Sequence, residues 1–113
     1  MKNICPQVVI QNFFEPCILY VLLEKSSYGY DIQKQLKDRC TCDVNTGNLY
    51  RCLSRMQKSK YIQRTGTKSE IGPKRYMYTI TEVGKVYLNE WIASLKQQNK
   101  IISTLIKNYK KTL

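Results

Sequence analysis

The first apolar positions of the chain recur at helical spacing and predict helical structure up to residue 24. Pro16 stands inside this run, and a proline either interrupts a helix or occupies its first turn. We therefore expect a short leading helix followed by a helix over residues 16–24. The apolar positions of the run are Val9, Phe13, Ile18, Leu19, Leu22 and Leu23.

A short polar turn leads into a second helix, whose apolar positions Tyr28, Ile32 and Leu36 lie four apart. We expect this helix to begin at Ser27 or Tyr28. Gly29 in its first turn is unfavourable for a helix on intrinsic propensity. The glycine therefore indicates close packing against a neighbouring helix.

A third helix follows a connection at residues 40–44, with Asn45 or Thr46 as its N-cap. One face is apolar and comprises Leu49, Leu53 and Met56. The other face is polar and basic and comprises Asn48, Arg51, Arg55 and Lys58. Two short helices joined by a brief turn, the second with a basic outer face, are typical of a helix-turn-helix.

The period changes after Lys60, where residues 61–65 and 75–80 are rich in β-forming side chains. Residues 66–73 between them have the glycines and polar side chains of a loop, with lysine and arginine following. This pattern predicts a β-hairpin with a basic tip, the wing of a winged helix. Tyr76 and Tyr78 are expected to pack the wing onto the core.

Thr81 and Glu82 begin a last helix that nothing interrupts as far as Lys111. Thirty helical residues span about 45 Å, more than the width of a small domain. An apolar stripe of that length needs a second chain to cover it, so the helix predicts a homodimer. The residues expected at the dimer interface are Tyr87, Trp91, Leu95, Ile102, Leu105 and Tyr109.

The charge of the chain is concentrated in its middle third. The 113 residues carry 19 Lys and Arg, 8 Asp and Glu and a net charge of +11. Residues 1–43 are neutral in sum, whereas residues 44–81 hold eight basic side chains and a single acidic one. Such a block is typical of a surface that binds a polyanion, with nucleic acid as the first candidate and an anionic membrane surface as the second.

The residue types argue against an enzyme or a metal protein. The chain has no histidine, no nucleophile with a base and no phosphate-binding glycine loop, so neither catalysis nor a cofactor is expected. Five cysteines are an odd number, which argues against a disulfide framework and leaves the pair Cys40 and Cys42 open to oxidant or metal sensing. No apolar run is long enough to span a bilayer and no secretory signal is present, so we expect a cytoplasmic protein.

The predicted helix-turn-helix and wing assign the candidate DNA contacts. Residues at the start of the third helix are expected to approach base edges or nearby phosphates, and its arginines and lysine to neutralise phosphates. The cations of the hairpin are expected to reach phosphates or the minor groove. Of the two tyrosines at the start of the second helix, one is expected in the core and Tyr28 on a phosphate. The full set is Tyr28, Thr46, Asn48, Tyr50, Arg51, Arg55, Lys58, Lys68, Lys74 and Arg75.

Several segments, in this order and spacing, resemble the PadR-like regulators, a family of bacterial winged-helix repressors. They are LL at 22–23, YGYDI at 28–32, NTGNLY at 45–50, YI at 61–62 and KRYMYTITEVG at 74–84. The resemblance runs from about residue 18 to residue 95. It implies a dimer that places two recognition helices in successive major grooves of a roughly palindromic operator, and it places the chain in the small subgroup with one C-terminal helix.

Several PadR-like regulators sense small aromatic or cationic compounds in or near the dimer interface. The resemblance therefore implies an effector site that includes Trp91 and Leu95. This sequence departs from the family at two places. Leu95 stands where drug-sensing members have a tryptophan, with Trp91 one turn earlier, and Gly72-Pro73 replaces the Gly-Gly that often precedes the second wing strand.

Together these patterns predict an α+β fold that is mostly α. Residues 1–80 form a winged helix-turn-helix DNA-binding domain and residues 81–113 form a long C-terminal dimerisation helix. The expected function is sequence-specific transcriptional regulation by a homodimer, with repression following from the resemblance. Two alternatives stay open: a nucleic-acid binder without sequence preference, and an interaction protein whose amphipathic C-terminal helix docks on another partner or an anionic membrane.

Overall fold

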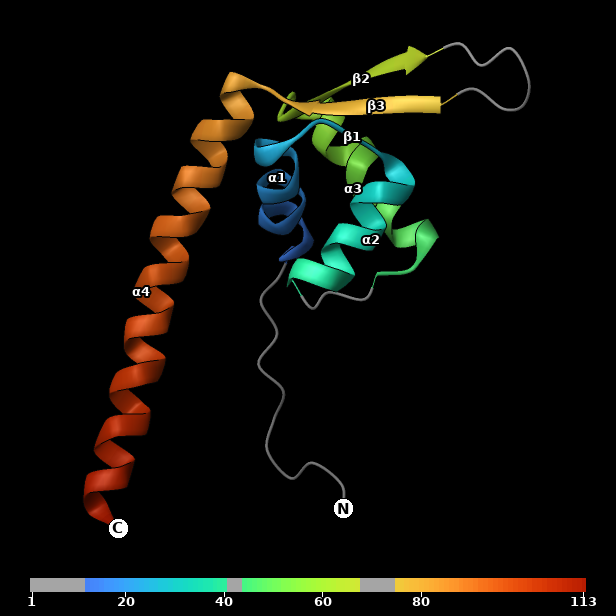
Figure 1. Cartoon of the computed structure of the whole chain (residues 1–113). Helices are drawn as coiled ribbons and strands as arrows, with labels where there is room; N and C mark the ends of the chain where they lie inside the picture. Colours follow the sequence, from blue (N-terminus) through green and yellow to red (C-terminus); the bar gives the residue numbers. More distant parts are fainter. Residues whose placement is uncertain (1–11, 41–43, 68–74) are drawn as a thin grey trace.

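The computed structural model describes residues 12–40, 44–67 and 75–113. Its elements are α1 (Phe14–Glu24), β1 (Ser27–Tyr28), α2 (Gly29–Cys40), α3 (Thr46–Lys58), β2 (Ile62–Thr67), β3 (Arg75–Ile80) and α4 (Glu82–Thr112). The chain is mostly helical, with a small antiparallel sheet and a long C-terminal helix (Figure 1). This architecture confirms the predicted fold class.

The first described helix begins two residues earlier than its sequence predicts. α1 starts at Phe14, and Pro16 lies inside its first turn rather than at a break. A proline is tolerated there because the first N–H groups of a helix have no intrahelical partner. The predicted leading helix falls mainly on residues 1–11, outside the described ranges.

The second helix begins later than predicted, because Ser27 and Tyr28 form the short strand β1. In the sheet, Ser27 pairs with Tyr78 of β3 and Tyr28 pairs with Met77 of β3. Because both residues belong to the sheet, α2 begins only at Gly29. The expectation of a helix start at Ser27 or Tyr28 is therefore wrong.

The wing forms as predicted, with β2 extending two residues further than the pattern indicates. β2 and β3 pair antiparallel from Ile62 opposite Ile80 to Thr67 opposite Arg75, and the strand order is β1-β3-β2. Tyr78 is buried and Tyr76 is half-buried against the core, which confirms that both pack the wing onto the domain.

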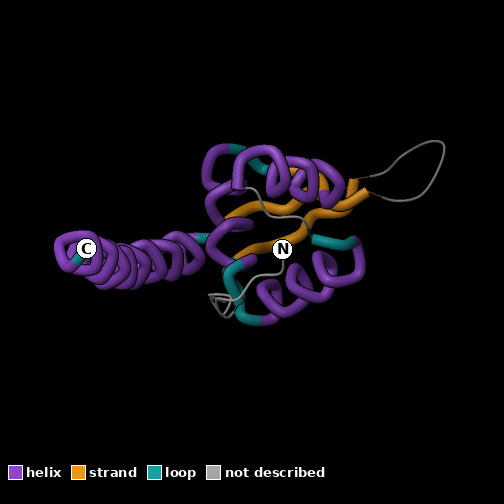
Figure 2. Tube along the Cα trace, turned by 90° about the horizontal axis from the view of Figure 1, so that it is seen from below, coloured by secondary structure: helices purple, strands orange, loops and turns teal. Residues whose placement is uncertain are grey.

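The core lies between the three short helices and the sheet. Figure 2 shows α1, α2 and α3 gathered around the strands, with α4 projecting from one side. The largest fully buried side chains come from all three helices and from β2 and are Ile18, Leu19, Ile32, Leu36, Leu49, Leu53, Met56 and Ile62. These include the predicted apolar faces of α2 and α3, except for Tyr28.

The long helix α4 is anchored at its first turn and then leaves the domain. The Thr81 Oγ1 accepts the Gly84 N–H at 2.9 Å and contacts the Lys60 carbonyl oxygen at 2.6 Å, so the cap also ties α4 to the start of the wing. A Cβ on Gly84 would lie 2.1 Å from the Tyr61 carbonyl oxygen, which explains a glycine so early in a helix. Because α4 projects from the domain, the molecule is elongated and measures 65 × 36 × 21 Å (Figure 1).

Candidate nucleic-acid interface

The start of α3 is fixed by local hydrogen bonds. The Asn45 side chain accepts the Asn48 N–H at 2.8 Å, which confirms Asn45 as the N-cap. Gln33 of α2 donates to the Val44 carbonyl oxygen at 3.0 Å and lies 3.4 Å from the Thr46 hydroxyl. Gln33 therefore holds the end of the turn between the two helices, a role that its place on the polar side of α2 did not indicate.

The outward face of α3 is polar, as predicted. Thr46, Asn48, Arg51 and Lys58 are exposed, and the Arg51 guanidinium donates to the Asn48 side-chain oxygen. Gly47 lies on this face in open space, because an added Cβ would meet nothing nearer than the Asn45 Oδ1 at 3.6 Å. That space rules out tight packing as the reason for this glycine.

Arg55 differs from its neighbours in the predicted basic stripe. Its Nε lies 3.2 Å from Oε2 of Glu15 on α1, and its guanidinium contacts the Cys52 sulfur at 3.4 Å. The arginine side chain is half-exposed, whereas Glu15 is buried. In the stripe, Arg51 and Lys58 face solvent, whereas Arg55 forms an ion pair with the buried Glu15.

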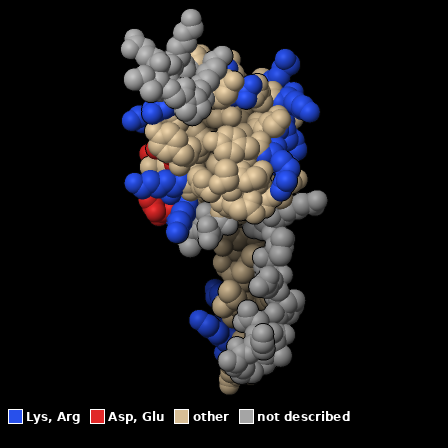
Figure 3. All heavy atoms as spheres, turned by 90° about the vertical axis from the view of Figure 1, so that its right-hand side faces the viewer, with Lys and Arg blue, Asp and Glu red and all other residues tan. Residues whose placement is uncertain are grey.

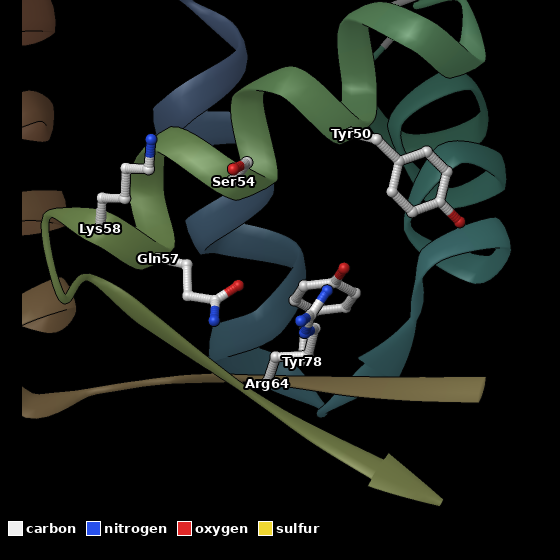
Figure 4. Close-up of a pocket in the computed structure, with 6 residues that line it drawn as sticks. All are labelled: Tyr50, Ser54, Gln57, Lys58, Arg64 and Tyr78. Atoms are coloured by element: carbon white, nitrogen blue, oxygen red, sulfur yellow. The ribbon is translucent and has the colours of Figure 1, made fainter. Parts of the chain in front are cut away.

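A groove of about 370 Å³ separates α3 from the wing (Figure 4). Four of its lining residues come from α3, and the wing contributes Arg64 from β2 and Tyr78 from β3. Two cations, a hydroxyl and a carboxamide that line one groove are suited to an oxyanion such as a phosphodiester. The lining residues are Tyr50, Ser54, Gln57, Lys58, Arg64 and Tyr78.

Tyrosines line the neighbouring pocket of about 280 Å³, where the wing meets the start of α2. Tyr28 and Tyr30 stack with ring centroids 6.0 Å apart, Tyr28 half-buried and Tyr30 58% exposed. The expectation that one of them lies in the core is therefore wrong, because Tyr28 of β1 is only half-buried and Tyr30 of α2 is exposed. Arg75 lies over the Tyr28 ring at 5.7 Å, and Arg64 lies over the Tyr76 ring at 3.9 Å.

Tyr50 joins the groove to the tyrosine pocket and lines both. A Cβ on Gly29 would lie 2.3 Å from the Tyr50 Oη, so the predicted close packing of this glycine against a neighbouring helix is confirmed. Tyr78 also lines both sites, and burial raises the pKa of its hydroxyl.

The side of the molecule toward which the wing points carries more basic than acidic side chains (Figure 3). Lysine and arginine side chains gather along both margins of this face, and the visible acidic side chains are confined to one edge. Among the predicted DNA contacts, Lys68 and Lys74 lie outside the described residues.

The predicted interface residues of α4 fall into two groups. Tyr87 and Trp91 pack within their own chain: Tyr87 stacks on Tyr61 with centroids 3.9 Å apart, and Trp91 meets the Tyr87 ring edge-on at 6.4 Å. Leu95 is half-buried. In the part of α4 that leaves the domain, several apolar side chains are exposed. They are Ile101, Ile102, Leu105, Ile106 and Tyr109, and Leu113 after the helix is exposed as well.

The described residues contain no group of three or more cysteine and carboxylate side chains that could hold a metal ion. Cys40 is half-buried, while Cys42 lies outside the described ranges. Among the helices that the structure describes, none is both long and apolar enough to cross a membrane.

A three-helix core, a two-stranded wing and a helix with an exposed basic face define the winged helix-turn-helix class of DNA-binding proteins. The model of the PadR-like family of transcriptional regulators matches residues 18–90. The chain belongs to the PadR-like family of transcriptional regulators.

Relatives of known sequence and structure agree with this assignment. An uncharacterised protein of Lysinibacillus sphaericus is 30% identical over 83% of this chain and 88% of its own length. The crystal structure of a PadR-like regulator from Bacillus cereus is 34% identical, with a TM-score of 0.73 over 85% of this chain and 93% of that chain. A PadR-family regulator from Clostridium difficile is 25% identical, with a TM-score of 0.76 over 84% of this chain and 99% of that chain.

Bacillus subtilis PadR shares the fold and was solved in complex with operator DNA. It is 24% identical, with a TM-score of 0.66 over 72% of this chain and 47% of that longer chain.

Proposed function

We propose that this regulator is a homodimeric, sequence-specific repressor that acts in the bacterial cytoplasm on a pseudo-palindromic operator. Residues 1–80 bind DNA and residues 81–113 pair two chains. The observation that carries the proposal is the placing of α3, whose exposed polar face lies beside a cation-lined groove and the wing. Polar side chains on such a helix contact base edges in the major groove, while neighbouring cations bind the phosphates of the DNA backbone.

The contacts divide by chemistry. Thr46 and Asn48 lie at the start of α3, from which side chains reach base edges. Arg51, Lys58 and Arg64 are exposed cations suited to phosphates, and the tyrosine hydroxyls of the adjoining pocket add donors. The complex of Bacillus subtilis PadR with its operator supports DNA as the polyanion.

Dimerisation is supported by the exposed end of α4. Leu105 and Tyr109 are 69% and 62% exposed and lie on the same side of the helix as Ile102. An apolar stripe of this kind on a helix that leaves its domain is stable in water only when another surface covers it, and two-fold pairing of equivalent helices does so.

Response to an effector is the remaining part of the proposal. Trp91 and Leu95 lie on α4 where the helix leaves the domain, next to the stacked rings of Tyr87 and Tyr61. Half-buried aromatic rings at such a place suit a planar aromatic or cationic compound.

Selection of bound duplexes from a random DNA library at physiological salt tests the proposal. We expect enrichment of two inverted half-sites, and a complex that survives excess random competitor. Recovery of no consensus, with a complex that competitor removes, would instead support a nucleic-acid binder without sequence preference. Protein that stays monomeric and binds no DNA would support an interaction protein.

A further inference from the structure

A buried carboxylate lies where α1, α3 and α4 come together. The Glu15 side chain is 7% exposed, and burial of a carboxylate is costly unless it is paired and hydrogen-bonded. Each of its oxygens accepts a hydrogen bond from another helix. The Tyr87 hydroxyl donates to Oε1 at 2.7 Å, and the Arg55 Nε donates to Oε2 at 3.2 Å.

The two partners come from the helices that have separate tasks in the proposed function. Arg55 belongs to α3, which faces the DNA, and Tyr87 belongs to α4, which extends toward the second chain. Their separations from Glu15 in the sequence are 40 and 72 residues. A single side chain of α1 thus connects the DNA-reading helix with the dimerisation helix.

The α4 side of this connection is held rigidly. The Tyr87 ring stacks on Tyr61 with planes 6° apart, and the Trp91 ring supports it edge-on at 83°. Burial and the Glu15 carboxylate both raise the pKa of Tyr87, whose hydroxyl is the donor of the bond. The hydrogen bond therefore has a fixed direction as well as a short distance.

We propose that Glu15 is a positioning residue that sets the orientation of α3 relative to α4, and so the spacing between half-sites that the dimer accepts. This inference rests on the proposed dimeric, sequence-specific function. Because α4 carries the dimer contact and α3 meets the DNA, a small rotation at their junction moves the two recognition helices relative to each other. The two half-sites lie about 34 Å apart along the duplex. The distance between the two recognition helices must match this separation for both helices to bind.

Spacing variants of the selected duplex test the inference. Dissociation constants are measured for duplexes with one or two base pairs added or removed between the half-sites. We expect the unaltered protein to prefer one spacing. Tyr87→Phe keeps the ring stack and removes the hydroxyl, and with it the hydrogen bond to Glu15, and it should reduce that preference about fivefold while the dimer persists. Glu15→Gln should act in the same direction.

Tyr20→Phe is the matched control. It removes a hydroxyl of α1 that accepts a hydrogen bond from Arg39 at 2.7 Å, away from the junction, and should leave the spacing preference unchanged. If Glu15→Gln does not fold, Tyr87→Phe alone decides the question.

Two results would overturn the inference. A spacing profile of Tyr87→Phe identical to that of the unaltered protein would show that the hydrogen bond does not orient the helices. A uniform loss of affinity at every spacing would show that it only stabilises the domain. The proposed function would survive both results, whereas it would fall, and the inference with it, if the unaltered protein bound without any preferred spacing.

Discussion

Two glycines near helix starts show how surroundings decide the effect of one methyl group. A Cβ on Gly84 would lie 2.1 Å from the backbone oxygen of Tyr61, which cannot move without displacing the wing. A Cβ on Gly47 has open space. We expect Gly84→Ala to lower the free energy of unfolding by about 2 kcal/mol.

Gly47→Ala is the control for that substitution. It should leave the free energy of unfolding unchanged or raise it by up to about 1 kcal/mol, since alanine favours a helix more than glycine. Urea unfolding of both variants measures the difference. Equal stability of the two would contradict the close approach of α4 to the start of the wing.

Arg51 is the exposed cation of α3 on which the phosphate assignment is best tested. Arg51→Ala should weaken binding to specific and random duplexes alike and reduce the slope of log K against log salt by about 1. Arg39→Ala removes the same charge from an ion pair with Glu24 at the end of α2 and should change the slope less. Fluorescence anisotropy at four salt concentrations measures both, and an unchanged slope for Arg51→Ala would refute the phosphate contact.

At the scale of elements, α3 depends on its cap. Asn45→Ala removes the acceptor of the Asn48 N–H and should lower the free energy of unfolding by about 1 kcal/mol. Asn45→Ser keeps an oxygen at the same place and should retain most of the stability. Thermal unfolding measures the stability of both variants. An equal loss of stability in both would show that the Asn45 side chain does not act as the N-cap of α3.

Elements with a strong local signal could be predicted from the sequence. The bounds of β3 and the starts of α3 and α4 agree with the structure because alternation, Asn45 and Thr81 mark them locally. The strand β1 could not be predicted, because two residues carry no period and their pairing depends on β3.

The candidate site was predictable only where it follows helix periodicity. The spacing places Arg51 and Arg55 on one stripe, but it contains no information about Glu15, which lies 40 residues from Arg55 and forms an ion pair with it. Arg64 was missed for the same reason, since its part in the groove depends on how β2 approaches α3. Contacts between distant segments determine which cations remain available to DNA.

At the scale of the whole molecule, the exposed end of α4 is the surface that pairs two chains in our proposal. Leu105→Glu introduces a charge at a side chain that is 69% exposed, so the single domain should fold as before. We expect this variant to be monomeric by light scattering and to lose affinity for the selected duplex at least about tenfold.

Lys107→Glu changes the charge on the neighbouring polar side of the same helix and should remain dimeric. A dimeric Leu105→Glu variant would place the interface elsewhere on the molecule.

The most direct test of the central claim is the mass of the complex with the selected duplex, measured by size-exclusion chromatography with light scattering. We expect two chains on one duplex, formed at physiological salt in the presence of random competitor DNA. One chain per duplex, or several chains in numbers that vary with duplex length, would contradict it.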